Sequence, residues 1–405
     1  MRKASVSVDP SKVNAKCGAC GLYKKCITPK MEVAGKGRKS ILIVSAFPGR
    51  AEDREGVPLV GQSGAYLERE LGRVGVDLRR DCWLTNALIC HPGDTDVKSD
   101  HVKWCRPNVV KTITDLKPKT VLLLGKEPCQ SVVSWLWGRS AFTSKEGVEL
   151  WTGMKIPAQK INAWVLPTYN PAYVLRNNDG RKNVKPDPVP QILFRQHLKH
   201  MIDHVGDRPW DTVPDWRKDI DVILDVDKAA RIIRKMIARG GLVAFDYEGT
   251  TLKPESPKAQ IVSCSVCWNG KKTIAYPWAG EAITATSELL KSPLGKIAAN
   301  QKFEDRWTRR ILGHRVRNWV FDTMLAAHII DNRPGITGLD FQAFANLGLS
   351  VYSEHIKPYL KSKGSMTSNK IRQISTHDLL LYNGLDSLVE YKLAMHQTQQ
   401  LGITL

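Results

Sequence analysis

Continuous runs of apolar residues alternate with amphipathic stretches through the first half of the chain. Four of these runs are long enough for buried strands, and they lie at 41–47, 82–89, 120–125 and 163–169. Strands that are apolar on both faces and separated by helical segments are typical of a parallel sheet with helices on each side. The pattern therefore predicts a doubly wound parallel-sheet α/β domain.

The second half of the chain opens with strand patterns that are separated by short turns. Apolar segments at 241–248, 259–268 and 271–278 follow one another, which predicts a three-stranded antiparallel meander. A helix that ends near Lys291, a strand at 296–300 and further helical patterns come after it. Strands first and helices afterwards predict a mixed-sheet α/β domain of ribonuclease H-like shape.

A polar segment rich in proline and charge, without periodicity, separates these two patterns near 203–220. We place a first domain at 1–205, a linker at 206–220 and a second domain at 221–405. The chain has 405 residues, of which 42% are hydrophobic, and this is enough for two conventional cores.

The chain is strongly basic, with 60 Lys and Arg against 40 Asp and Glu and a formal charge of +20. This balance favours a polyanionic partner, by default nucleic acid, over an acidic protein partner. The alternative is a generally basic, well-solvated surface. No apolar run follows the basic N-terminus or approaches the length of a membrane span, so we expect a soluble intracellular protein without a membrane partner.

Carboxylates occur at strand and helix ends of the second half. Asp246 and Glu248 stand two apart at the end of a strand, so both point to one face, where they can share a divalent metal ion. The alternative is a pair of solvated acids. Glu304 and Asp305 lie in the helix after the strand at 296–300, and because they point about 100° apart, only one can readily face the site.

Tyr382 and Asp386 add a third element. They are spaced i, i+4 and therefore lie on one face of a helix that opens with a capping-box pattern at Ser375. The three segments FDYEGTTLKP, KIAANQKFED and YNGLDSLVEYKL resemble, in order, the motifs of the proofreading exonuclease domain of family A DNA polymerases, the DEDDy branch of the DEDD exonucleases. The resemblance covers about residues 220–405.

This resemblance implies a metal-dependent 3′→5′ DNA exonuclease. It implies two Mg²⁺ or Mn²⁺ ions, a Tyr382 that orients the attacking water, and four metal ligands: Asp246, Glu248, Glu304 and Asp386. The family usually has Asp where this chain has Glu304, which still supplies an oxygen ligand on a longer side chain. Leu252 and Asn300 match residues that seat the terminal nucleotide, with core packing and a turn cap as the respective alternatives.

The cysteines of the first half suggest a metal or cluster site rather than disulfides. Cys17 and Cys20 form a C-x-x-C pair, and Cys90 and Cys105 lie fifteen positions apart. Four thiolates can hold a [4Fe–4S] cluster or one zinc ion, and the spacing alone leaves zinc, a cluster or no metal open.

A second resemblance covers about residues 14–200. The segments CGACGLYKKC, SAFPGRAEDREGVPLVGQSGAYLE, TNALICHPGDTDV and LPTYNPAYVLR resemble family 4 and related iron–sulfur uracil-DNA glycosylases. The resemblance implies a [4Fe–4S] cluster and a base pocket. The implied cluster ligands are Cys17, Cys20, Cys90 and Cys105; the implied substrate-binding residues are Pro48, Gly49, Leu59, Asn86 and Asn170.

The departures from this family lie in the pocket. Ala46 stands where the family has Glu, Leu59 where an aromatic ring stacks on uracil, and Asn170 where a His begins the minor-groove loop. We therefore expect a 3′→5′ exonuclease fused to a DNA-binding, glycosylase-like domain with weak or no activity on uracil. The alternatives are a bifunctional repair enzyme and a non-catalytic polymerase accessory protein. We expect single-stranded 3′ ends of DNA as substrate, possible partnership with a separate polymerase polypeptide, and a location in the cytoplasm of a bacterium or a phage-infected cell.

Overall fold

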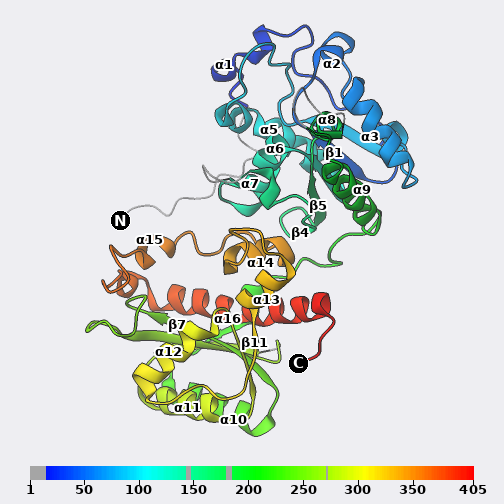
Figure 1. Ribbon diagram of the computed structural model, residues 1–405. Helices are drawn as coiled ribbons and strands as arrows, with labels where there is room; N and C mark the ends of the chain where they lie inside the picture. Colours follow the sequence, from blue (N-terminus) through cyan, green and yellow to red (C-terminus); the bar gives the residue numbers. More distant parts are fainter. Residues whose placement is uncertain (1–14, 143–146, 179–184, 271) are drawn as a thin grey trace. The chain divides into compact units, whose positions relative to one another are not determined.

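The computed structural model describes residues 15–142, 147–178, 185–270 and 272–405. The chain divides into two compact units, one of residues 1–213 with 348–350 and one of residues 214–347 with 351–405. None of the helices in the described ranges combines the length and apolar character that crossing a membrane requires. Each unit contains one sheet (Figure 1).

The first unit is built on a five-stranded sheet with the order β2-β1-β3-β5-β4. β1, β2, β3 and β5 are parallel and coincide with the four apolar runs, so the predicted parallel α/β sheet is confirmed. The antiparallel edge strand β4 was not predicted. The strands are Ile41–Ser45 (β1), Cys82–Asn86 (β2), Thr120–Leu124 (β3), Ile156–Ala158 (β4) and Ala163–Thr168 (β5).

Helices and loops cover this sheet. α3, α8 and α9 pack together in one cluster, where Leu67, Phe194 and Leu198 lie against apolar side chains of β1 and β3. The helices are Cys17–Cys20 (α1), Arg50–Glu55 (α2), Gln62–Gly72 (α3), Leu78–Asp81 (α4), Ser99–Leu116 (α5), Lys126–Pro128 (α6), Ser134–Trp137 (α7), Pro171–Asn178 (α8) and Val189–Ile202 (α9).

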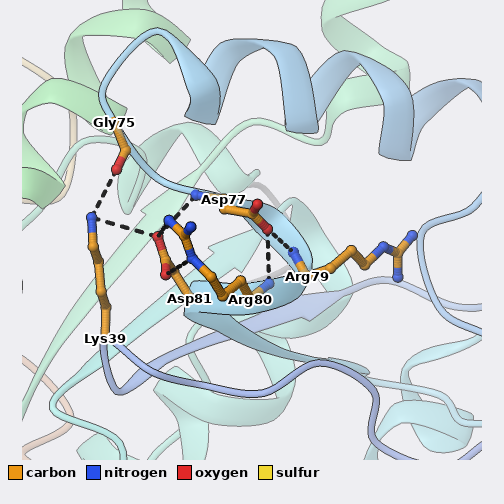
Figure 2. A network of polar contacts seen from close by, with 6 residues as sticks. All are labelled: Lys39, Gly75, Asp77, Arg79, Arg80 and Asp81. Atoms are coloured by element: carbon orange, nitrogen blue, oxygen red, sulfur yellow. Dashed lines mark hydrogen bonds and ion pairs between the residues drawn. The ribbon is translucent and has the colours of Figure 1, made fainter.

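A polar network fixes the short helix α4 at the start of β2 (Figure 2). Asp77 caps α4 by accepting hydrogen bonds from the backbone N–H groups of Arg79 and Arg80. Asp81 is buried and accepts from the Arg80 side chain at 3.0 Å, which holds the pKa of its carboxyl down at about 2. Lys39 joins Asp81 to the Gly75 carbonyl oxygen. The network therefore anchors the strand whose far end carries Asn86.

The second unit contains a six-stranded mixed sheet with the order β11-β10-β7-β8-β9-β6. β7, β8 and β9 form the predicted antiparallel meander; the last predicted strand was to begin at residue 271, which lies outside the described residues. The short strands β6 and β11 were not predicted. The strands are Ile220–Val222 (β6), Leu242–Gly249 (β7), Ile261–Trp268 (β8), Lys272–Pro277 (β9), Gly295–Ala298 (β10) and Trp319–Asp322 (β11).

Helices lie on both faces of this sheet. α10 and α11 pack against each other and against Phe245 and Tyr247 of β7, whereas the long helix α16 crosses β7, β8 and β9 (Figure 1). A Cβ at Gly384 would lie 2.5 Å from Ile220, so glycine lets α16 approach the sheet closely. The helices are Val226–Arg239 (α10), Gly280–Lys291 (α11), Gln301–Leu312 (α12), Thr323–Ile330 (α13), Leu339–Leu347 (α14), Lys357–Leu360 (α15) and Thr376–Leu401 (α16).

Candidate metal centre and base pocket

The alternation of side chains along β7 decides where its carboxylates point. Phe245 and Tyr247 pack into the core formed with α10 and α11. Because successive residues of a strand face opposite sides of the sheet, Asp246 and Glu248 point to the other face, where α16 lies. The predicted common direction of these two acids therefore follows from the packing of their neighbours.

Helix α16 brings a third carboxylate to this place. One oxygen each of Asp246, Glu248 and Asp386 lie within 4.8 Å of one another. Glu248 is 9% exposed and Asp386 is 5% exposed, so water screens their charges poorly. Three carboxylates in so small a space repel one another unless protons or cations neutralise them.

Asn383 holds Asp246 in place, and sequence reasoning missed it. Its Nδ2 donates to Asp246 Oδ2 at 2.7 Å, and its Oδ1 accepts from the Ser263 hydroxyl at 3.0 Å. Asn383 is fully buried. The available signal was its i, i+3 spacing from Asp386, which places an amide on the same side of the helix.

Glu304, rather than Asp305, is the buried carboxylate of α12. Glu304 lies in the first turn of α12 and is 2% exposed, whereas Asp305 accepts a hydrogen bond from the Val316 backbone N–H. The Tyr247 backbone hydrogen-bonds Glu304, but within the described part of the chain Glu304 Oε2 has no hydrogen-bond partner. Glu304 lies outside the group of three carboxylates that share the 4.8 Å space.

Glu390 is a further buried carboxylate that sequence reasoning missed. It lies one helical turn after Asp386 and is 1% exposed. Its Oε1 accepts from the Ala299 backbone N–H at 3.1 Å, at the end of β10, while Oε2 finds no partner among the described residues. An acidic residue four positions after Asp386 on a helix that covers a sheet was the signal in the sequence.

The titration behaviour of these groups reflects their crowding. Burial raises the pKa of four carboxyl groups well above the ordinary range, and the neighbouring carboxylates raise it further; these groups are Asp246, Glu248, Glu304 and Glu390. Burial also raises the pKa of Asp386 to about 7, although hydrogen bonds from Tyr352 and Tyr382 oppose the change. Crowded, buried carboxylates that resist ionisation on their own suit a hard cation such as Mg²⁺ or Mn²⁺, which would neutralise their ionised forms.

Metal-free protein should lose stability of the second unit as the pH rises from about 4 to about 7. The folded protein retains a proton on Asp386 that the unfolded chain, with an ordinary pKa of 3.8, releases in this range. The stabilising contribution is therefore complete below the unfolded pKa and is lost as the pH approaches the folded pKa. Excess Mg²⁺ should reverse the trend because it favours the ionised carboxylates. Melting temperatures at about pH 5 and pH 8, with EDTA and with Mg²⁺, measure this, and a metal-free protein that is more stable at the higher pH would contradict it.

The remaining predicted exonuclease residues are Tyr382, Leu252 and Asn300. Tyr382 lies one helical turn before Asp386, and its hydroxyl opposes the rise in the pKa of Asp386. Leu252 is 57% exposed, so its alternative role in core packing is wrong. Asn300 lies at the N-cap position of α12 with a positive φ of 68°, but its side chain makes no capping hydrogen bond; instead its backbone N–H donates to Asp322.

The first unit contains a cavity of about 460 Å³ at the ends of its strands. Four of the five predicted pocket residues line this cavity: Gly49, Leu59, Asn86 and Asn170. Pro48 is not among the lining residues, and its carbonyl oxygen accepts from the His91 ring at 2.7 Å. The lining includes Ala46, as the sequence indicated.

Leu59 has an unusual backbone conformation at this cavity. Its φ is 57°, in the left-handed region that side-chain-bearing residues seldom adopt. Arg79 donates to the carbonyl oxygens of Pro58 and Leu59 at 2.8 and 2.6 Å, so the guanidinium holds this turn. Because the backbone is held in place, a substitution at position 59 should change the side chain that lines the cavity without moving the turn.

The two asparagines of the pocket are differently engaged. Asn86 is 3% exposed, and its amide contacts the sulfur of Met31 at 3.9 Å. Asn170 caps α8 by accepting from the Ala172 backbone N–H at 2.9 Å, and its Nδ2 approaches the Leu124 carbonyl oxygen at 3.4 Å. The Oδ1 atom of Asn170 is thus already occupied by the hydrogen bond that caps α8.

The structure brings the four predicted cysteine ligands together. Cys17 and Cys20 from α1, Cys90 after β2 and Cys105 of α5 line one small apolar hollow. Burial raises the pKa of Cys90 to about 12 and raises that of Cys105. Cys26, which appeared to be an ordinary residue in the sequence, packs against the same cluster, and its thiol donates to the Tyr23 carbonyl oxygen. Soft sulfur donors in apolar surroundings are the kind of ligand that iron–sulfur clusters and zinc take.

The metal content and melting temperature of two cysteine variants should distinguish metal ligands from core residues. Cys17→Ser should remove metal from the full-length protein and lower the melting temperature of the first unit, because a lost ligand releases the loops that the metal joins. Cys129→Ala is the control, since Cys129 is buried away from this hollow. Anaerobically purified wild type should contain about four irons. Stoichiometric zinc without iron, or unchanged iron content in Cys17→Ser, would contradict the cluster assignment.

Comparison with known proteins matches each unit to a different family. A model described as the uracil DNA glycosylase superfamily matches residues 34–191, and one described as 3′-5′ exonuclease matches residues 221–401. The type-4 uracil-DNA glycosylase of Saccharolobus solfataricus is 30% identical over 175 residues, covering 42% of this chain and 78% of that protein. The type-4 enzyme of Thermotoga maritima is 28% identical over 178 residues, covering 42% of this chain and 85% of that protein.

Solved structures also resemble part of the chain. The POL domain of Pol1 from M. smegmatis has a TM-score of 0.33 at 15% identity, and the match covers 45% of this chain but 27% of that protein. Escherichia coli RNase D has a TM-score of 0.33 at 14% identity, with coverage of 45% and 46%.

Proposed function

Because the chain belongs to the uracil-DNA glycosylase superfamily through its first unit and carries a 3′-5′ exonuclease domain in its second, we propose that it binds DNA and removes nucleotides from 3′ ends. The observation that carries this proposal is the convergence of Asp246, Glu248 and Asp386 within 4.8 Å. The basic composition supports a nucleic-acid substrate.

In this proposal Asp246, Glu248, Glu304 and Asp386 hold two Mg²⁺ or Mn²⁺ ions. Bound metal ions supply Lewis acidity that stabilises the attacking and leaving oxygens of an in-line displacement. Tyr382 presents a hydroxyl beside Asp386, where it can hydrogen-bond the attacking water. Leu252 is exposed and Asn300 begins α12, so both can contact the terminal nucleotide.

We propose that the first unit binds DNA but excises uracil weakly or not at all. The pocket retains Asn86, which supports base binding, but Ala46 and Leu59 line it in place of the Glu and the aromatic residue of the glycosylases that the sequence resembles. Cys17, Cys20, Cys90 and Cys105 would hold a [4Fe–4S] cluster that joins α1 to α5. A separate polymerase polypeptide is the partner that a proofreading role would need.

Degradation of a 5′-labelled single-stranded DNA oligonucleotide tests the exonuclease proposal. Full-length protein should shorten the labelled oligonucleotide stepwise in the presence of Mg²⁺ or Mn²⁺ and should leave it intact in EDTA. An oligonucleotide whose 3′ end is blocked by an inverted nucleotide should resist, and an RNA of the same sequence measures the preference for DNA. Absence of metal-dependent shortening, or equal attack on the blocked substrate, would refute the proposal.

A further inference from the structure

A second tyrosine contacts the carboxylate centre. Tyr352 lies between α14 and α15, and its hydroxyl donates to Asp386 Oδ1 at 2.5 Å. Tyr352 and Asp386 are each 5% exposed, so the contact is buried. The Tyr352 ring lies 6.0 Å from the Tyr382 ring, measured between centroids, with an angle of 38° between the planes. Two phenols thus approach one carboxylate.

We propose that Tyr352 is a positioning residue that fixes Asp386 for metal binding and frees the Tyr382 hydroxyl for the attacking water. The inference rests on the proposed role of Asp386 as a metal ligand. A carboxylate has two oxygens, and a hydrogen bond to Oδ1 restricts the rotation of the group while leaving Oδ2 available to a metal ion.

The backbone that carries Tyr352 is itself well anchored. Ser353 is 1% exposed, and its hydroxyl donates to Asp340 Oδ1 of α14 at 3.2 Å. Lys357 forms an ion pair with the same Asp340. Tyr352 therefore reaches Asp386 from a segment fastened to α14, so the position of Asp386 depends on two separate parts of the second unit.

The two tyrosines differ in how they are attached to Asp386. Tyr382 lies on α16 itself, one turn before Asp386, and a rotation of its side chain can move its hydroxyl away without disturbing the helix. Tyr352 comes from another segment and would keep Asp386 hydrogen-bonded when Tyr382 turns to substrate. Removing either hydroxyl should therefore have different consequences.

Direct Mn²⁺ binding to the full-length protein, measured from the electron paramagnetic resonance of free Mn²⁺, tests the inference. Tyr352→Phe should raise the Mn²⁺ dissociation constant by roughly tenfold or more, the cost typical of losing a residue that orients a metal ligand. Tyr382→Phe should slow DNA shortening while leaving Mn²⁺ affinity within about twofold of wild type, because only the hydroxyl meant for water is lost. Tyr276→Phe is the matched control, since the hydroxyl of this buried tyrosine bonds Thr286 in the opposite core.

A second measurement asks whether Tyr352 acts through Asp386. In an Asp386→Asn background, Tyr352→Phe should cause little further loss of Mn²⁺ affinity, because the carboxylate it positions is already absent. If Tyr352→Phe lowers stability, the rise in melting temperature on adding Mn²⁺ reports the same affinity.

The outcomes separate the inference from the proposed function. Wild-type protein that binds Mn²⁺ and shortens DNA, together with a Tyr352→Phe variant of unchanged affinity, would overturn the inference alone. An equal loss in the wild-type and Asp386→Asn backgrounds would also overturn it. Wild-type protein that neither binds Mn²⁺ nor shortens DNA would overturn both.

Discussion

Asp246→Asn should reduce the rate of 3′-end shortening by at least about a thousandfold, the equivalent of ~4 kcal/mol of metal-dependent stabilisation of the transition state. Asp246 is one of the three carboxylates within 4.8 Å, and it is the one that Asn383 fixes to α16. The asparagine is nearly isosteric and retains an oxygen that can accept from Asn383. The loss should therefore come from metal binding rather than from misfolding.

The same variant should be more stable than wild type when metal is absent. Burial and the neighbouring Asp386 oppose ionisation of Asp246 in the folded protein, whereas the unfolded chain ionises freely, and an uncharged Asn removes this cost of folding. Asp305→Asn serves as the control, because Asp305 bonds the Val316 backbone outside the carboxylate group. Activity rates measured together with EDTA melting temperatures check both effects. A folded Asp246→Asn protein with wild-type nuclease activity would show that the site assignment is wrong.

Uracil release by the first unit should be slower than that of the Thermotoga maritima type-4 enzyme by at least about a thousandfold. Leu59 lacks an aromatic face, and stacking is worth ~1–3 kcal/mol per base. Asn170 cannot carry the positive charge of a histidine, and Ala46 has no polar group, so the departing uracil anion loses stabilisation from the pocket. Each ~1.4 kcal/mol lost slows the reaction tenfold.

The assay should use full-length Asp246→Asn protein, which leaves the oligonucleotide intact while uracil release is measured. The triple variant Ala46→Glu, Leu59→Phe and Asn170→His should gain activity, because it restores the three missing groups, and Arg79 already holds the backbone at Leu59. DNA binding should persist in both proteins and weaken steeply with salt, since phosphate contacts supply most non-specific affinity. Rapid uracil release by protein with the natural pocket would contradict the prediction.

The sequence predicted the strands that carry long apolar patterns, and among the four shortest strands of the described residues it predicted β10 but missed β4, β6 and β11. The four apolar runs of the first half and the meander of the second appear as β1, β2, β3, β5 and β7 to β9. By contrast, β4 and β6 have three residues each, and a pattern of that length cannot be distinguished from a loop. These strands form only because a neighbouring strand supplies hydrogen-bond partners.

The sequence likewise predicted some residues of the candidate site and missed others. Helix geometry predicted that only one of Glu304 and Asp305 could face the site, and in the structure Glu304 is the buried one. Asn383, Glu390 and Tyr352 were missed because their roles depend on partners far away in the sequence, such as Ala299 for Glu390. The i, i+3 and i, i+4 spacings from Asp386 place Asn383 and Glu390 on its side of the helix, but only the packing of α16 against the sheet shows that this side is buried.

Helix α16 carries Tyr382, Asn383, Asp386 and Glu390, so the pitch of one helix fixes these groups relative to one another as soon as the helix forms. Whether these groups meet Asp246 and Glu248 of β7 then depends mainly on how far along β7 and β8 the helix packs. The position of α16 along the sheet is fixed by two hydrogen bonds from β8, one from the Ser263 hydroxyl to Asn383 Oδ1 (3.0 Å) and one from the Ser265 hydroxyl to the Asn383 backbone carbonyl oxygen (2.7 Å). Two serine hydroxyls of a neighbouring strand thus position the carboxylates of α16, although neither serine is itself a proposed metal ligand.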